Sequence, residues 1–159
     1  MSLLVLGLGN AVMSDDAFGG RVIAALQKRY RFSDRVTVLD GGTLGLDLLP
    51  YFEGVDRLLI IDALEMGAAP GSIFRLVGEE VPRAFASKLS VHQMGVQDLL
   101  AVCELQGHLP GELVVWGVQP GSIEMAMEMT PAVMAALDTV VARVVAELQR
   151  WGEMPQAAA

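Results

Sequence analysis

Cysteine, histidine and basic residues are all scarce in this sequence. Its 159 residues include one cysteine and two histidines, and 11 Lys and Arg stand against 19 Asp and Glu, for a net charge of −8. A single cysteine excludes an internal disulfide and any cysteine-rich zinc site. The acidic balance argues against a nucleic-acid partner, which requires a basic surface. It is compatible with a cation or a basic partner, and ordinary solubility charge explains it equally well.

Long hydrophobic runs are also missing, although 53% of the residues are hydrophobic. No apolar stretch reaches the roughly 18 residues of a membrane span. The apolar N-terminus is only as long as a strand, lacks a basic leader and runs into Gly7-x-Gly9. These features exclude a signal peptide. We therefore expect a cytoplasmic protein without membrane association.

The familiar hydrolase motifs are absent as well. The sequence has no Gly-x-Ser-x-Gly elbow, no His-Glu-x-x-His and no Walker loop. His92 and Cys103 fall eleven residues apart on one predicted helix, a separation of about 16 Å along its axis. They cannot form a catalytic pair, and Cys103 is expected in the core. His108 follows Gly107 and is expected in a loop. A conventional serine, cysteine or zinc protease is therefore unsupported.

The pattern that is present alternates strands with helices. Buried strands are predicted at residues 3–6, 35–39, 57–61, 72–77 and 113–118. A helix is predicted from Phe18, with Val22, Leu26 and Tyr30 on its apolar face. Another runs from a Ser90 capping box to Gly107, and a third begins at Thr130-Pro131, with its apolar face at Val133, Leu137, Val141, Val144 and Leu148.

This alternation predicts an α/β fold in three layers, a mostly parallel mixed sheet with helices on both faces. The loop before residues 72–77 is too short for a helical crossover, so that strand is expected to run antiparallel, as a hairpin partner of the strand before it. We predict a single domain over residues 1–151 and a flexible C-terminal tail over residues 152–159.

The Gly7-x-Gly9 loop resembles a dinucleotide fingerprint but departs from it. A Rossmann motif requires a third glycine where this chain has Val12. Asp15 and Asp16 occupy the start of the following helix, where two carboxylates would repel a pyrophosphate. The loop is therefore suited to a cation.

Three side chains that bind metals occupy comparable places in the predicted fold. Asp16 follows the first strand, Asp62 ends the third, and His92 lies in the first turn of a later helix. Two carboxylates and one imidazole suit a borderline divalent metal with open positions for water. Each also has a structural explanation, as a helix-start residue, a strand-end cap or a cap residue. Asp40, before Gly41 and Gly42, is equally a turn residue or a functional one.

Several motifs together resemble one enzyme family. They are Gly7-Leu-Gly-Asn10, Ser14-Asp15-Asp16 with Gly19, Asp40-Gly41-Gly42-Thr43, Ile61-Asp62-Ala63 and His92-Gln93. In this order they are similar to the nickel-iron hydrogenase maturation endopeptidases, and the similarity covers nearly the whole chain. The resemblance implies a cytoplasmic enzyme that removes the C-terminal peptide of a hydrogenase large-subunit precursor after nickel insertion. We expect a monomer, because nothing in the sequence indicates an obligate interface.

The resemblance also assigns roles to residues. Asp16, Asp62 and His92 are implied as the catalytic, metal-contacting residues, and Asp40, Gly41, Gly42 and Thr43 as the region that selects the substrate. Nickel is implied to arrive with the precursor as the recognition element, and other divalent metals are expected to substitute in vitro.

Two positions depart from the family pattern. Many members carry Glu where this chain has Asp16, which is one methylene shorter, so Asp15 is a candidate to share its role. Gly20 replaces a branched residue and loosens the helix by up to about 1 kcal/mol. Two alternatives remain open, a non-catalytic chaperone that checks nickel in the same precursor and a nucleotide-binding Rossmann-like domain.

Overall fold

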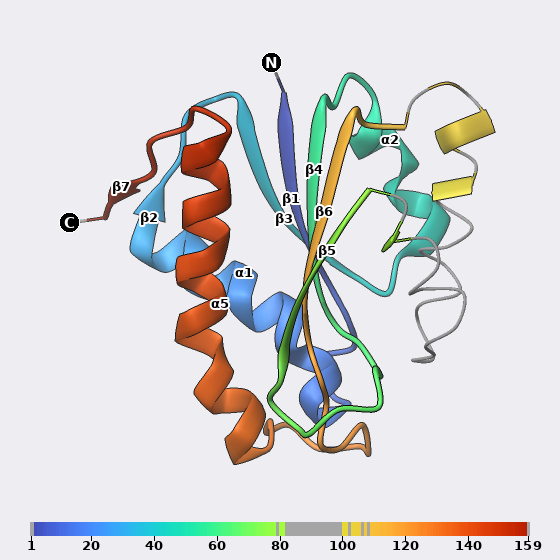
Figure 1. Ribbon diagram of the computed structural model, residues 1–159, viewed down its shortest axis with the longest axis vertical. Coiled ribbons are helices and arrows are strands. Elements are labelled where there is room, and N and C mark those ends of the chain that lie inside the picture. The colour runs from blue at the N-terminus through green and yellow to red at the C-terminus, as the bar shows by residue number, and fades with distance from the viewer. Residues whose placement is uncertain are drawn as a thin grey trace.

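The computed structural model describes residues 2–78, 80–81, 100–101, 103–105, 107 and 109–158. Five strands form its main sheet in the order β3-β1-β4-β6-β5 (Figure 1). β1 (Leu3–Leu8), β3 (Val36–Gly42), β4 (Arg57–Ala63) and β6 (Glu112–Val118) run parallel, and β5 (Ile73–Val77) runs antiparallel to β6. The predicted mostly parallel mixed sheet is confirmed.

The partner predicted for β5 is wrong, although its direction is right. β5 pairs with β6, and β6 lies between β4 and β5. The reason is burial. β6 is almost wholly apolar and buried from Leu113 to Val118, so it takes the interior position, whereas β5 is only partly buried and takes the edge. Arg75 of β5 ion-pairs with the buried Glu147 of a helix, and this contact raises the pKa of the Arg75 guanidinium.

Helices cover both faces of the sheet (Figure 1). α1 (Phe18–Arg29) and α5 (Pro131–Arg150) pack on one face, against Leu3, Val5 and their neighbours. The other face buries Leu4 and Leu6 beneath the turn η2 (Gly45–Leu48) and α2 (Leu49–Phe52). Successive β1 side chains therefore alternate between two cores, as a strand covered on both faces requires. No helix in the described part of the chain is both long and apolar enough to cross a membrane.

The structure confirms the predicted place of Cys103 in the core. It is buried with Leu100 in the second core, and burial raises the pKa of its thiol. The predicted face of α5 is buried except for Leu137, which is half-buried. α1 ends at Arg29, so Tyr30, predicted on its apolar face, instead begins a short strand.

The end of the chain is paired, which differs from the expected frayed tail. β7 (Gln156–Ala157) runs antiparallel to β2 (Tyr30–Arg31). Glu153 is buried, accepts a hydrogen bond from the Ser33 hydroxyl at 2.7 Å and ion-pairs with Arg35 at 3.2 Å. A charged residue near the C-terminus is expected to be exposed. Glu153 is buried instead, because the fold brings it next to Ser33 and Arg35, about 120 residues earlier in the sequence.

Candidate active site

A pocket of about 160 Å³ opens outside the carboxyl ends of three parallel strands. It is lined by Asp16 after β1, by Ala63 and Glu65 at and after the end of β4, and by residues 120–123 after β6. The chain turns to one side of β1 to form β3 and to the other side to form β4, so the topology switches between β1 and β4. In open α/β sheets this switch point is where ligands bind.

Asp16 reaches the pocket from the short helix η1 (Ser14–Ala17). Its side chain is almost fully buried, and Oδ2 accepts a hydrogen bond from the Asn10 amide at 2.9 Å. Gly9 has a φ of +130°, and a Cβ there would lie 1.8 Å from the Asp16 carbonyl oxygen. The glycine at position 9 therefore allows η1 to pack against the strand end and sets the position of Asp16.

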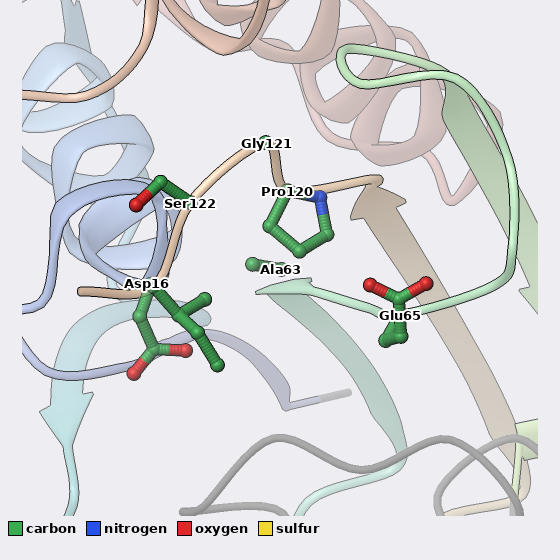
Figure 2. A pocket seen from close by; sticks show the side chains of 7 residues that line it. Asp16, Ala63, Glu65, Pro120, Gly121 and Ser122 are labelled. Carbon is green, nitrogen blue, oxygen red and sulfur yellow. The ribbon is translucent and has the colours of Figure 1, made fainter.

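Asp62 lies at the carboxyl end of β4 and is fully buried. Its Oδ1 accepts a hydrogen bond from the Ala63 amide at 2.8 Å. Ala63 lines the pocket beside Asp16 (Figure 2). Asp16 and Asp62 therefore lie at the same end of the sheet, as the sequence predicts. The structure adds that their strands, β1 and β4, are adjacent.

The third predicted ligand, His92, lies outside the described residues, as do its predicted capping box at Ser90 and Gln93 and the second histidine, His108. Among the side chains that the structure does describe, no group of three or more His, Cys, Asp or Glu is arranged to hold a metal ion. The set of Asp16, Asp62 and His92 therefore stays a prediction.

Asp15, the candidate to share the role of Asp16, has a different environment. Its fully buried carboxylate accepts four hydrogen bonds of 2.7–2.9 Å, from the amides of Gly121, Ser122 and Thr130 and from the Thr130 hydroxyl. Asp15 thus fastens the loop at 119–130 to the start of α1. Thr130, the residue before α5, gives its hydroxyl to this carboxylate and makes no side-chain cap of its own.

Comparisons with known proteins identify the family of the chain. The family model described as hydrogenase maturation protease matches residues 20–147. The chain belongs to this family. The protease is 40% identical over 153 residues to the hydrogenase 2 maturation protease of Escherichia coli (strain K12), a match that covers 96% of this chain and 93% of the relative. The enzyme class indicated by the sequence is therefore confirmed.

Solved structures give the same result for the fold. The hydrogenase maturating endopeptidase HybD from E. coli matches the protease with a TM-score of 0.95 and 39% identity, over 99% of this chain and 98% of that chain. The NiFe hydrogenase maturation protease HybD from Thermococcus kodakarensis matches with a TM-score of 0.76 and 29% identity, over 91% and 97%. The three-layer α/β fold predicted from the sequence is confirmed.

The predicted substrate-selecting region of the protease lies at the end of β3. Asp40, Gly41 and Gly42 belong to the strand, and the exposed Asp40 carboxylate accepts a hydrogen bond from the Gly42 amide at 3.0 Å. A Cβ on Gly20 would lie 3.0 Å from Asp40 Oδ2, so Gly20 leaves room for this carboxylate. Thr43 is exposed, and none of the described residues that line the pocket belongs to this segment.

Glu65 is a pocket residue that the sequence analysis missed. Figure 2 shows it across the pocket from Asp16, with Ala63 between them. Its carboxylate accepts hydrogen bonds from the Gln119 side-chain amide at 2.8 Å and from the Gly67 amide at 3.1 Å. Gln119 is itself buried and accepts from the Met66 and Ala68 amides. The sequence feature that could have indicated Glu65 is its position, three residues after Asp62 in the loop that follows the same strand.

Proposed function

We propose that this protein is an endopeptidase that removes the C-terminal peptide of a nickel-iron hydrogenase large-subunit precursor after nickel insertion. The observation that carries this function is that Asp16 lines a pocket at the switch point of the sheet, and that the buried Asp62 directly precedes the pocket residue Ala63, in a chain of the hydrogenase maturation protease family. The names of the relatives support the class of substrate, since they are proteases of hydrogenase 2 and of NiFe hydrogenase.

In this proposal nickel belongs to the substrate and serves as the recognition element. Asp16, Asp62 and His92 fill the free coordination positions of the precursor's nickel and so fix the position of the nearby scissile bond. Carboxylate and imidazole ligands suit a divalent metal of this kind. The bound metal then polarises the scissile carbonyl or activates a water molecule for attack. A precursor without nickel lacks this anchor and is left uncut.

The backbone around the two acids supports their role. Asp16 accepts from the Asn10 amide and Asp62 from the Ala63 amide, and both side chains are buried. Ligands held by neighbouring groups lose little freedom when a metal binds, which favours a defined geometry. We further propose that the enzyme acts as a monomer in the cytoplasm. We expect other divalent metals to substitute for nickel in vitro.

A cleavage assay tests the proposed function. The purified protein is mixed with the precursor, once loaded with nickel and once free of it, and the mass of the precursor's C-terminus is followed. We expect loss of a short C-terminal peptide from the loaded form alone. Binding without a change in mass would favour the nickel-checking chaperone, and cleavage of both forms would remove the recognition role of nickel.

Two variants test the predicted residues, and a third serves as the control. Asp62→Asn and His92→Ala are expected to abolish cleavage, because each removes a metal ligand. Asp138→Asn is the matched control, since Asp138 is an exposed acid of α5 whose ion pair is with Arg29, the last residue of α1. Exposed pairs contribute little stability, so this variant is expected to cleave at the wild-type rate.

A further inference from the structure

An exposed apolar surface adjoins the pocket. It consists of Val12, which is 41% exposed, and of Ile123, Met125 and Met127, which are 38%, 82% and 66% exposed. We call these four residues the apolar strip. Single exposed apolar residues are ordinary, but several on neighbouring loops indicate a binding surface.

The apolar strip is held in place by backbone hydrogen bonds and buried side chains. Ala126, between the two methionines, donates to the Val12 carbonyl at 3.0 Å and accepts from the Ser14 amide at 2.8 Å. Arg21 donates to the Met127 carbonyl at 2.9 Å. Asp15 holds both ends of the same loop, through Gly121, Ser122 and Thr130. The surface is therefore preformed, and the loop loses little conformational entropy when a partner docks on it.

Two further observations identify the partner. Ile123 lines the pocket together with Asp16 and also belongs to the apolar strip, so the two surfaces are continuous. Glu124 and Glu128 alternate with the apolar residues and are exposed, and neither forms an ion pair within the part of the chain that the structure describes. A chain that enters the pocket and carries apolar and basic side chains would match both features.

We propose that the apolar strip docks the segment of the precursor next to the scissile bond, an extended peptide with apolar side chains and basic neighbours. This inference depends on the proposed function, because it takes the precursor as the substrate. Methionine side chains are flexible and polarisable and adapt to different apolar partners. The strip then supplies affinity, the acidic residues beside it steer the basic segment, and the pocket performs the chemistry.

The test compares exposed methionines that lie before and after α5. Met125→Ser/Met127→Ser removes the centre of the apolar strip from exposed positions, where folding is unaffected. Met154→Ser is the control, because Met154 is 74% exposed and follows the C-terminal end of α5, whereas the apolar strip precedes its N-terminal end. With the nickel-loaded precursor we expect the double variant to raise KM about tenfold, a loss of about 1.4 kcal/mol of binding, with kcat unchanged. The control is expected to keep both constants.

The charges beside the strip have their own test. Glu124→Lys/Glu128→Lys is expected to slow association with the precursor and to weaken its dependence on salt, because steering by opposite charges is lost.

An unchanged KM in the methionine variant would overturn the proposal. So would a wild-type dimer in sedimentation that the methionine variant abolishes without changing KM, since a second copy of the chain would then occupy the strip.

Failure of the proposed function gives a different result. If the wild-type protein binds the precursor without cutting it, the same variants are compared by Kd, and the strip is still tested. If it binds neither form of the precursor, both proposals are overturned together.

Discussion

Asp15 and Asp16 are chemically identical neighbours that are equally buried, yet their surroundings give them different roles. Asp15 accepts four hydrogen bonds from a loop more than 100 residues away, so its carboxylate is occupied by the fold. Asp16 lies one residue further along η1 and lines the pocket. A short helix turns successive side chains in different directions, and this turn separates a structural acid from the predicted ligand.

Asparagine at each position separates the two roles. Asp15→Asn replaces a charged hydrogen-bond acceptor with a neutral amide, and the new NH2 group would face groups that are themselves donors. We therefore expect the free energy of unfolding to fall by about 3 kcal/mol. Asp16→Asn is expected to abolish cleavage and to lower the free energy of unfolding less than Asp15→Asn does, by about 1 kcal/mol, because the Asn side-chain oxygen can still accept from the Asn10 amide. Urea unfolding and the cleavage assay measure the two effects. Equal stability of both variants would contradict the assignment of Asp15.

Two adjacent glycines at the start of α1 show how closely this helix packs on the sheet. A Cβ on Gly19 would lie 2.3 Å from the Leu8 carbonyl oxygen and 2.4 Å from that of Ile61, both backbone atoms. For a Cβ on Gly20 the three nearest atoms all belong to the exposed side chain of Asp40, at 3.0–3.4 Å. Gly19 is therefore required by backbone contacts, whereas Gly20 faces a group that can move.

Alanine at these two positions should have opposite effects on stability. Gly19→Ala forces α1 away from β1 and β4, and we expect it to cost about 2 kcal/mol or more. Gly20→Ala gains helix propensity, and we expect it to raise the free energy of unfolding by about 0.5 kcal/mol once Asp40 has moved aside. Thermal unfolding of both proteins measures the difference. Destabilisation of equal size at both positions would show that Asp40 is held rigidly.

The elements themselves could be predicted from the sequence because their signals are local. Apolar runs and helical spacing gave β1, α1, β4, β6 and α5, and strand ends gave the location of Asp16 and Asp62. The neighbour of β5 could not be predicted, because a short loop fixes the direction of a strand and not its partner. The role of Asp15 and the burial of Glu153 depend on contacts more than 100 residues apart, which periodicity does not report.

Over the whole molecule, the paired C-terminus and the pocket lie at opposite ends. The loop at 119–130 precedes α5, and β7 follows it (Figure 1); α5 has 20 residues, so its axis is about 30 Å long. The C-terminal segment contributes Glu153, which binds Ser33 and Arg35, and a strand that pairs with β2. These contacts stabilise the end of the sheet that lies away from the pocket.

Truncation after Gly152 should therefore separate stability from activity. Loss of the buried hydrogen bonds of Glu153 and of the β2–β7 pairing is expected to lower the free energy of unfolding by about 2 kcal/mol. Cleavage of the nickel-loaded precursor below the unfolding temperature should keep its wild-type kcat and KM. Within the described chain, the hydrogen bonds and ion pairs of the removed segment go to residues outside the pocket and the apolar strip. Glu153→Gln is the finer variant, since it keeps β7 and weakens only the contacts to Ser33 and Arg35. A fall in kcat in either protein would mean that the two ends of the sheet are coupled, and the C-terminal segment would then belong to the catalytic machinery.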